Sequence, residues 1–420
     1  MKQVDVLIIG GGSAGLSAAL QMKEKGINRL LILERNKELG GILQQCIHNG
    51  FGLQTFHEEL SGPMYAQRFI DQCMEKKIPY QLQSDVLSID KNGIVEYASP
   101  IDGFQSIQAK TIVLACGCYE RTRGAIQIPG QRLPGVYTAG SAQRFLNLEN
   151  ILVGKRIFIL GSGDIGLIMA RRMTLEGAKV LGVAEIMPYS NGLNRNIVQC
   201  LKDFSIPLYL SHTVVDIRGK DHVEQVVIAK VDEKRRIIPN TEQVFDVDTL
   251  LLSIGLIPEM SLVQTIDMEL DPRTKGASIN EYYQTSIPHI YACGNALHVH
   301  DVVDFVTLEA KEMATCVVQD LKHEIDKHEE IQTEAGHGVS YVLPQRISAK
   351  PKKDITFCLR VTKPYRNAKI VLLSDNEIIK ELPKPYLLPS EMVRIYIKKE
   401  KLQELAGTLK IEVFENEKRI

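Results

Sequence analysis

The chain lacks paired cysteines, although it is 420 residues long and contains eight cysteines. The eight are scattered, and no Cys-x-x-Cys pair occurs anywhere in the sequence. This spacing argues against a disulfide framework and against a zinc ribbon. We therefore expect reduced thiols, as in a protein of the cytosol.

Strong charge of one sign and long apolar runs are missing as well. The chain carries 50 basic and 51 acidic residues, for a formal net charge of -1, so nucleic-acid binding is not indicated. No uninterrupted apolar run approaches the ~18 residues of a membrane span. Lys2 precedes an apolar run, as in a signal peptide, but Asp5 and the glycines at 10–12 interrupt it. We interpret this run as a first strand and expect a soluble, cytoplasmic protein.

The composition is that of a globular protein, with 44% hydrophobic and 24% charged residues. At about 150 residues per domain, the length predicts two or three domains.

The most informative stretch opens the chain. An apolar run at residues 4–9 leads into a Gly-x-Gly-x-x-Gly turn made by Gly10, Gly12 and Gly15, and a helix-like run follows. Such a turn lets backbone approach a pyrophosphate at a helix N-terminus. A second apolar run ends in Glu34, at the distance from the turn where a ribose-binding carboxylate is expected. Together these features predict a dinucleotide-binding fold.

The same pattern recurs in the middle of the chain. An apolar run at 155–160 precedes Gly161, Gly163 and Gly166, and the strand-like run that follows the next helix ends in Glu185. Two such patterns predict two bound dinucleotides.

The remaining predicted elements are consistent with an α/β fold. We expect an amphipathic helix at 61–77, short strands within 80–98 and at 104–109, and a helix at 308–322. Two buried strands end on glycine, at 110–117 and 248–255, and a later strand runs into Cys293-Gly294-Asn295. Beyond about 336, short apolar runs broken by Pro and Asn indicate a β-sandwich. The expected strands of this tail are 341–343, 355–361, 369–373, 393–397 and 408–414. The predicted fold is therefore two Rossmann-like domains followed by a small C-terminal β-sandwich-like domain.

In this order, the motifs resemble the pyridine nucleotide-disulfide oxidoreductase superfamily, flavoproteins with two dinucleotide-binding domains, over residues 1–322. The resemblance implies FAD in the first fold and NAD(P)H in the second. It also implies a discontinuous FAD-binding domain at 1–122 and 256–335, an NAD(P)-binding domain at 123–255, and a C-terminal β domain at 336–420.

The resemblance further implies which residues bind each cofactor. For FAD they are Gly10, Gly12, Ser13, Ala14, Gly15, Glu34, Arg35, Gly41, Val86, Ala115, Cys116, Gly117, Gly294, Asn295, Thr307 and Leu308. For NAD(P) they are Gly161, Gly163, Asp164, Ile165, Gly166, Glu185 and Gly255. Asn295 stands where the superfamily has Asp, so one charge is missing, although an amide can still hydrogen-bond. Thr307 and Leu308 are expected to open the helix that points at the flavin.

The redox disulfide of the superfamily is absent from both of its usual places. Leu43 and His48 occupy the positions of the cysteine pair of glutathione-type reductases, and residues 135–141 lack the Cys-x-x-Cys of the thioredoxin reductase type. Segments 115–121 and 133–143 are similar to the flavin subunits of opine oxidase, cyanide synthase and sarcosine oxidase. Segments 40–52 and 297–301 look closer to a bacterial FAD-dependent oxidoreductase found with glycerol-3-phosphate dehydrogenases. This branch implies a subunit that passes electrons between a partner dehydrogenase and another carrier.

The acid of the second fold bears on the choice of nucleotide. Glu185 would repel a 2′-phosphate, and residues 182–187 contain no basic side chain, which favours NAD over NADP. The alternative is that Glu185 is a solvated strand end and that either cofactor binds. Hydride transfer from nicotinamide to flavin requires no acid or base from the protein.

Catalytic candidates lie in two loops. Cys46 and His48 follow the flavin-side glycines, and His298, His300 and Asp301 follow the late glycine turn. We hypothesise that the loops converge beside the flavin, with His48, His300 or Cys46 tuning it or handling a proton. Alternatively, the histidines are satisfied by backbone. His-x-His-Asp offers too few ligands, so no metal site is predicted. Cys116 and Cys118 are either a vicinal redox pair or ordinary buried thiols.

The sequence thus predicts an NADH-linked FAD oxidoreductase without a redox disulfide. Its partner would be a dehydrogenase subunit, such as glycerol-3-phosphate dehydrogenase, or a small acceptor, with the β domain as a docking surface. The sequence also allows a homo-oligomer. The alternatives are a self-sufficient amine, opine or hydroxy-acid dehydrogenase and a non-catalytic flavoprotein that serves as a redox sensor or assembly factor.

Overall fold

A computed structural model describes residues 1–325, 329–375, 377–403, 405 and 407–415. The chain divides into two compact units. Unit 1 comprises Met1–Cys118 and Pro258–Ile420, and unit 2 comprises Tyr119–Ile257. The chain passes between them within β9 (Cys118–Glu120) and β18 (Leu256–Pro258).

Unit 1 begins with a seven-stranded sheet in the order β5-β2-β1-β8-β7-β6, with β19 also paired to β8. The strands are β1 (Lys2–Ile9), β2 (Leu30–Leu33), β5 (Tyr80–Gln81), β6 (Asp85–Ile89), β7 (Ile94–Ser99), β8 (Gly103–Leu114) and β19 (Ile290–Ala292). Strands β5, β2, β1, β8 and β19 pair in parallel, and β7 and β6 add antiparallel. Val6 to Ile8 are inaccessible to solvent, as expected for a parallel strand covered on both faces.

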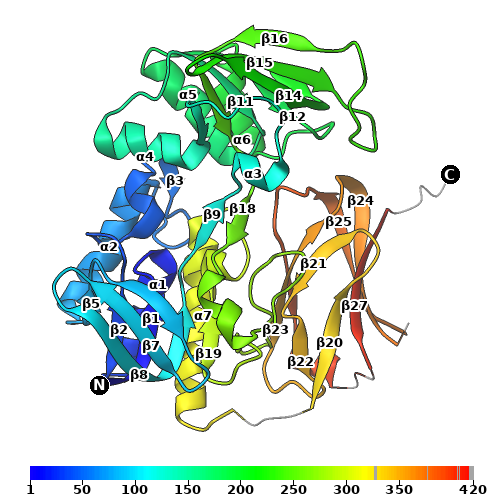
Figure 1. Ribbon diagram of the computed structural model, residues 1–420. Coiled ribbons are helices and arrows are strands. Elements are labelled where there is room, and N and C mark those ends of the chain that lie inside the picture. The colour runs from blue at the N-terminus through cyan, green and yellow to red at the C-terminus, as the bar shows by residue number, and fades with distance from the viewer. Residues whose placement is uncertain (326–328, 376, 404, 406, 416–420) are drawn as a thin grey trace. The chain divides into compact units, whose positions relative to one another are not determined.

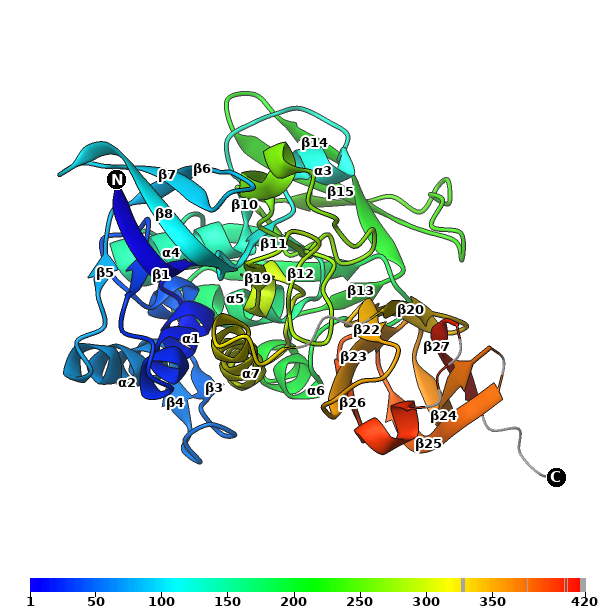
Figure 2. The same cartoon turned by 90° about the horizontal axis from the view of Figure 1, so that it is seen from below.

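Helices α1 (Ser13–Glu24), α2 (Gly62–Glu75) and α7 (Val303–Leu321) share one apolar core with β1 and β2. Figures 1 and 2 show α1 and α7 side by side next to the sheet. The other face packs on a second core that includes Val263 and Ile266. The shorter elements of this region are η1 (Gly41–Gln45), β3 (Asn49–Phe51), β4 (Leu60–Ser61), η3 (Ser261–Ile266) and η4 (Gly294–Ala296).

Unit 2 repeats the design with a five-stranded sheet in the order β10-β17-β11-β12-β13, parallel throughout. Its strands are β10 (Val136–Thr138), β11 (Arg156–Leu160), β12 (Lys179–Glu185), β13 (Leu208–Leu210) and β17 (Thr249–Leu252). The helical elements are α3 (Arg123–Ile126), α4 (Ala139–Glu149), α5 (Asp164–Leu175), α6 (Asn194–Asn196) and η2 (Ile197–Lys202). An antiparallel sheet of β14 (His212–Gly219), β15 (Val223–Lys230) and β16 (Gln243–Asp246) completes the unit.

The C-terminal part of unit 1 consists of two further sheets. One has the order β22-β20-β27-β24-β25 and the other the order β21-β23-β26. The strands are β20 (Glu330–Ala335), β21 (Val339–Leu343), β22 (Arg346–Ser348), β23 (Ile355–Val361), β24 (Tyr365–Ser374), β25 (Glu377–Leu387), β26 (Val393–Ile397) and β27 (Leu409–Glu415), with η5 (Lys399–Leu402) between the last two. Phe357 from one sheet and Ile370 and Ile411 from the other lie in one buried core, as in a sandwich.

The predicted fold class is confirmed: two parallel-sheet dinucleotide folds and a C-terminal sheet domain are present. Some boundaries differ from expectation. Residues 104–109 and 110–117 were expected as two strands, but β8 runs unbroken from Gly103 to Leu114. The C-terminal sheets begin with β20 at Glu330, before the predicted boundary at 335, because β20 pairs with β22 and β27.

Helix α7 begins at Val303, so the expectation that Thr307 and Leu308 open this helix is wrong. Asp304 supplies the acidic residue that a first helical turn favours, and it extends the helix toward the N-terminus. Thr307 instead lies buried in the second turn, and Leu308 is exposed.

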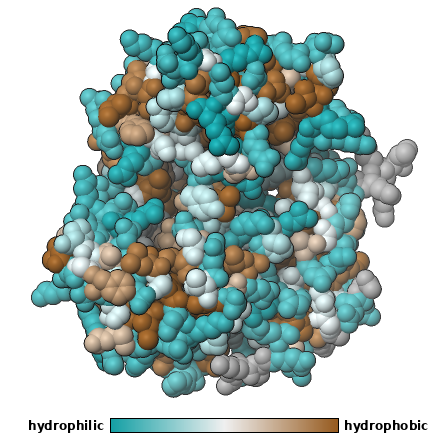
Figure 3. All heavy atoms as spheres, in the orientation of Figure 1, coloured by the Kyte–Doolittle hydropathy of each residue, from teal (hydrophilic) through white to brown (hydrophobic). Residues whose placement is uncertain are grey.

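Apolar residues on the face displayed in Figure 3 are interspersed with hydrophilic ones. Isolated exposed apolar side chains are normal for a folded protein surface.

Candidate functional site

The first glycine turn joins β1 to α1, and its three glycines differ in what surrounds them. A Cβ at Gly15 would lie 1.9 Å from the carbonyl oxygen of Gly10, so only glycine lets the helix pack here. Gly12 has an ordinary backbone conformation, with φ of -80°, and a Cβ there would meet only Gly41 Cα, at 3.9 Å. The surroundings therefore do not require glycine at position 12, and its missing side chain leaves a cradle in front of the α1 N-terminus.

Glu34 at the end of β2 holds this turn. The carboxylate accepts from the Gly11 N–H at 2.7 Å, and from the backbone and side-chain nitrogens of Asn36 at 2.8 and 2.9 Å. Glu34 is buried, with 5% of its surface exposed. A carboxylate has about four acceptor positions, so capacity remains for a ribose hydroxyl.

The second turn, in unit 2, is built in the same way. The Glu185 carboxylate accepts from the Ser162 N–H at 3.0 Å, from the Ser162 hydroxyl at 2.6 Å and from the Met187 N–H at 3.0 Å. In both folds the acid therefore binds the residue after the first glycine and the residue two positions beyond itself. Gly163 precedes α5 with φ of -65°, and a Cβ there would meet only Ser253, at 3.2 Å. A side chain at Gly12 would therefore enter open space, whereas one at Gly163 would require the Ser253 side chain to move slightly.

Other predicted NAD(P) residues surround this second turn. The Asp164 carboxylate accepts from the Leu193 N–H at 2.8 Å and from Asn196 Nδ2 at 2.6 Å, so it orders the 193–196 segment. Ile165 packs against the core of the unit, and Gly166 lies against Ser253. Gly255 follows β17 with φ of +104°.

Several predicted FAD residues come together at the first turn. Gly41 lies next to Gly12, since a Cβ on Gly41 would be 3.1 Å from Gly12 Cα. Gly294 lies on α1, because its Cβ would be 2.9 Å from the Ala14 Cβ. The Ala115 carbonyl faces Gly10, and Gly117 follows with φ of +76°. Gly12, Gly41 and Gly294, which come from separate parts of the chain, therefore meet at the N-terminal end of α1.

The other predicted FAD residues lie around this group. Ser13 begins α1, and its carbonyl accepts from the Ser17 hydroxyl at 2.6 Å. Arg35 is exposed and Val86 is half-buried in β6. The Thr307 hydroxyl pairs with the Tyr65 hydroxyl at 2.7 Å, within the core rather than at a helix end.

Cys46 and His48 lie in the segment that follows η1. The Cys46 thiol donates to the Ile42 carbonyl at 3.3 Å, and burial raises the pKa of Cys46 to about 12. His48 Nδ1 lies 3.1 Å from the Asn49 carbonyl, and its ring is 4.9 Å from that of Phe51. The raised pKa keeps Cys46 a neutral thiol, which weakens it as a nucleophile.

Asp304 ties the segment after His48 to α7. Its carboxylate accepts from the Gly52 N–H at 3.1 Å and from the Thr55 N–H at 2.8 Å. Asp304 is fully buried, and sequence reasoning did not single it out. The two loops that carry the catalytic candidates are therefore linked through this helix.

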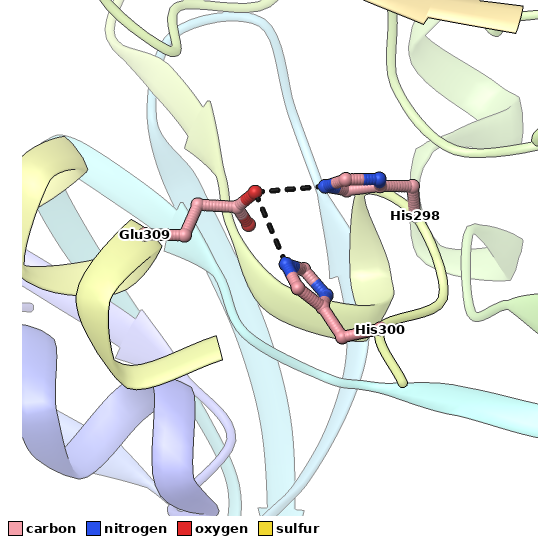
Figure 4. A group of neighbouring side chains, drawn as sticks. All are labelled: His298, His300 and Glu309. Atoms are coloured by element: carbon pink, nitrogen blue, oxygen red, sulfur yellow. Dashed lines mark hydrogen bonds and ion pairs between the residues drawn. The ribbon is translucent and has the colours of Figure 1, made fainter. Parts of the chain in front are cut away.

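The second loop forms a buried cluster of His298, His300 and Glu309 (Figure 4). His298 Nε2 lies 2.8 Å and His300 Nε2 3.3 Å from Glu309 Oε2, while Glu309 Oε1 accepts from the Gly294 N–H at 2.7 Å. Burial alone would raise the pKa of Glu309, but His300 and His298 hold it well below its usual range. Burial lowers the pKa of His298.

Glu309 was missed in the sequence because a glutamate near a helix start is unremarkable. The signal was available: Val306, Glu309 and Met313 recur at helical spacing on the buried face of α7. A charged residue within an apolar stripe is rare unless it is paired.

The C-terminal sheets hold the histidine loop from outside. The Arg360 guanidinium donates to the Asp301 carboxylate and to the Val299 carbonyl, the latter at 3.1 Å. The second Asp301 oxygen accepts from the Met392 N–H at 2.6 Å. Asp301, predicted as part of a flavin-side loop, is thus a structural anchor for residues of β23 and the β25–β26 connection.

Cys116 and Cys118, the candidate vicinal pair, lie close enough for Cys118 to influence the pKa of Cys116. The Cys116 thiol donates to the Glu259 carbonyl at 3.1 Å, and burial raises its pKa to about 12. The eight cysteines all lie within the described residues, and no disulfide joins any of them.

Comparison with known proteins agrees with this geometry. The family model described as pyridine nucleotide-disulphide oxidoreductase matches residues 4–319. The crystal structure of T. acidophilum thioredoxin reductase matches 77% of this chain and 100% of its own, with a TM-score of 0.63 and 23% identity, a likeness that shows the fold. Among the residues that the structure describes, no helix combines the length and the apolar character needed to cross a membrane.

The curated relatives match this chain over only part of their own length. Hydrogen cyanide synthase subunit HcnB of Pseudomonas protegens is 25% identical over 314 residues, 69% of this chain and 65% of that protein. The small chain of the NADPH glutamate synthase of Halomonas elongata is 24% identical over 336 residues, 73% of this chain and 66% of that protein. This chain therefore spans about two thirds of the length of these subunits. With the family match over most of the chain and both glycine turns in place, the chain belongs to the pyridine nucleotide-disulphide oxidoreductase family.

Proposed function

We propose that the chain is an NADH-linked FAD oxidoreductase that works without a redox disulfide and exchanges electrons with a partner dehydrogenase subunit or a small acceptor. The supporting observation is the pair of equivalent turns, in which Glu34 and Glu185 bind backbone in the same way and leave acceptor capacity unused. Bound FAD would supply the chemistry of taking a hydride from the nicotinamide and releasing electrons to an acceptor.

The first turn fits FAD. The open space at Gly12 and the adjoining Gly41 and Gly294 admit a pyrophosphate close to backbone, and Glu34 can accept from a ribose hydroxyl. We propose the FAD-binding domain at 1–122 and 256–335 on this basis. The chain's own contribution is to bind and orient the cofactor and to exclude water.

The second turn fits a nicotinamide dinucleotide, and we propose NAD rather than NADP. Glu185 is 3% exposed and already holds the turn, so a 2′-phosphate would meet a buried negative charge. One feature opposes the choice of NAD. Arg235, in the connection between β15 and β16, and Glu185 both lie close enough to Tyr189 to influence its pKa, which burial raises. Arg235 is therefore the residue to examine if NADPH is accepted.

Cys46 and Cys116 are poorly suited to carry electrons away from the flavin as a redox disulfide would. Cys46 and Cys116 both have raised pKa values, and neither is part of a disulfide. We propose that electrons pass directly to the acceptor. Of the catalytic candidates Cys46, His48 and His300, we favour His300 as the residue that tunes the flavin, because its ring is fixed by Asn295 and Glu309 at the proposed flavin site.

The partner that we propose is a dehydrogenase subunit, with glycerol-3-phosphate dehydrogenase as the candidate that the sequence resemblance gives. One of the curated relatives is named as a subunit and another as a small chain. The C-terminal sheets, which follow the family match, are the proposed docking surface.

Two glycine substitutions test the assignment of the turns. Gly12→Ala adds a methyl group to ordinary backbone with no neighbour nearer than 3.9 Å, so the fold should survive while the FAD cradle is filled. Gly163→Ala fills the corresponding position of the second turn, where the new methyl would lie 3.2 Å from Ser253 Oγ and the Ser253 side chain must move slightly. We expect the first variant to purify colourless with an unchanged circular dichroism spectrum. The second should stay yellow but lose NADH-driven flavin bleaching.

The matched control is Gly124→Ala, an exposed site where the new methyl would meet only Thr122 Oγ, at 3.7 Å. This variant should retain both flavin and bleaching. Full flavin occupancy in Gly12→Ala, or NADH bleaching at the wild-type rate in Gly163→Ala, would contradict the proposal.

A further inference from the structure

The cluster of His298, His300 and Glu309 is arranged as a set of converging ligands. One nitrogen of each histidine and one oxygen of Glu309 all lie within 4.8 Å of one another. Their side chains are 1%, 3% and 6% exposed. In Figure 4 both rings turn one nitrogen toward the same carboxylate oxygen. The cluster therefore presents three donor atoms to one buried point.

The hydrogen bonds of His300 show where its proton lies. Asn295 Oδ1 accepts from the backbone N–H of His300 at 3.0 Å and faces His300 Nδ1 at 3.3 Å. An amide oxygen carries no proton, so Nδ1 must be the donor. In a neutral imidazole, Nε2 is then a lone pair, and it points at the Glu309 carboxylate, which has only lone pairs to offer. Either a proton or a metal ion must therefore lie between His300 Nε2 and the Glu309 carboxylate.

We propose that His298, His300 and Glu309 bind one divalent transition-metal ion, with zinc or ferrous iron as the chemical class. Two histidines and one carboxylate form a donor set that both ions accept. Around zinc, ligands at about 2.0–2.1 Å lie about 2.9 Å apart at a right angle and about 3.3 Å apart at a tetrahedral angle. The observed separations of 2.8 and 3.3 Å from Glu309 Oε2 match these two values.

Outer hydrogen bonds of the kind that metal sites use are present around His300 and Glu309, whereas His298 Nδ1 has no hydrogen-bond partner among the described residues. A ligating histidine usually donates its other N–H to an oxygen, and His300 donates to Asn295. The second oxygen of Glu309 is held by the Gly294 N–H. Three protein ligands leave a position for water or for a substrate oxygen. No metal site was predicted from the sequence, because no further ligand was placed near His-x-His-Asp. Glu309 is that further ligand, and Asp301 is committed to Arg360.

The ion would also join the flavin-side turn to α7. Gly294 and Asn295 come from η4, whereas Glu309 lies on the helix, so one ion would fix the turn that we assign to FAD. The metal proposal stands on these three side chains alone. It can therefore fail while the flavin assignment holds, and a test that measures metal binding separates the two.

The test is metal content and zinc affinity of the flavin-containing protein. The protein is dialysed against chelator, loaded with Zn²⁺, and measured by plasma mass spectrometry and by competition with a chromogenic chelator. We expect about one equivalent of zinc in wild type, and X-ray absorption at the zinc edge should show imidazole ligands near 2.0 Å. His298→Gln, His300→Gln and Glu309→Gln should each retain less than about one-tenth equivalent. Asn295→Ala should weaken the affinity about 10–100-fold.

The control is His222→Ala, which removes an exposed histidine and should leave the zinc content unchanged. Glu309→Gln keeps an oxygen that can accept from Gly294, so it is the variant most suited to fold, and circular dichroism verifies each variant. Wild-type protein that binds no zinc or iron would overturn the proposal and leave a shared proton between His300 and Glu309. Equal zinc in all variants, or a zinc-edge spectrum without imidazole, would likewise overturn it.

Discussion

Replacing Asp301 by Ala should destabilise the C-terminal sheets and release the histidine loop together. Asp301 receives the Arg360 guanidinium on one oxygen and the Met392 N–H on the other. The change leaves a cation without its carboxylate and a backbone donor without its acceptor. Because Arg360 also binds the Val299 carbonyl, the disturbance reaches the loop that carries His298 and His300.

The magnitude follows from burial. The Asp301 and Arg360 side chains are 13% and 17% exposed, so water replaces little of the lost interaction. Breaking a buried ion pair costs about 3–5 kcal/mol, and partial solvation lowers our expectation to about 2–4 kcal/mol. Asp301→Asn keeps an acceptor for Met392 and should cost about 1–2 kcal/mol. A double-mutant cycle with Arg360→Met should give a coupling of about 1–3 kcal/mol.

The chain contains no tryptophan, which makes the assay simple. Tyr386, in β25, is 66% exposed, so Tyr386→Trp gives a fluorescent reporter of the C-terminal sheets with little disturbance. Urea unfolding is followed by this fluorescence in the wild-type and Asp301 backgrounds, and hydrogen exchange reports on residues 298–301. A loss below about 0.5 kcal/mol, the level of an ordinary surface change, or unaltered exchange in the loop would refute the reasoning.

Two further predictions concern ionisation and nucleotide choice. Burial raises the pKa of Tyr65 to about 12, above the ordinary value of 10, so its stabilising contribution is complete below pH 10 and is lost as the pH rises from 10 to 12. Between pH 10 and pH 12, the free energy of unfolding of Tyr65→Phe should therefore fall by about 2–3 kcal/mol less than that of wild type. Urea unfolding at pH 10 and at pH 12 measures both values, and an equal fall in the two proteins would contradict this prediction. Glu185→Gln should raise the NADPH-to-NADH ratio of kcat/KM about tenfold in stopped-flow flavin reduction, since it removes a negative charge near the ribose. A wild-type preference for NADPH that Arg235→Ala abolishes would instead assign the nucleotide choice to the connection between β15 and β16.

The sequence predicted those parts of the fold that local spacing determines. Gly10, Gly12, Gly15 and Glu34 form one motif within a single β-α-β unit, and the unit closes as the spacing requires. The recurrence at Gly161 to Glu185 was predictable for the same reason. Both cases rest on neighbours close in the chain, where backbone geometry leaves few alternatives.

The histidine cluster was missed because the start of α7 was predicted at the wrong residue. A helix assumed to start at 308 places Glu309 in its first turn, where an acid is expected to face solvent and the helix dipole. The actual start at Val303 turns Glu309 to the buried side, next to His298 and His300. The error in the helix start therefore led us to expect an exposed Glu309 where the structure has a buried one. The Arg360 contact was also beyond prediction, because it joins residues 59 positions apart, one in the loop before α7 and the other in β23.

These contacts change how docking by the C-terminal sheets can be tested. Tyr341, Leu343 and Cys358 belong to the same buried core as strands of the dinucleotide fold, so removing residues 337–420 would expose that core and unlock the histidine loop at once. Loss of both flavin and partner from such a truncation would not separate docking from folding. Substitutions on exposed β25 do separate them, because Ile378 and Tyr386 are 60% and 66% exposed. If β25 contacts the partner, Ile378→Asp should weaken complex formation while flavin content and the urea midpoint stay at wild-type values. Retention of the complex at full affinity would instead assign the C-terminal sheets to holding the histidine loop.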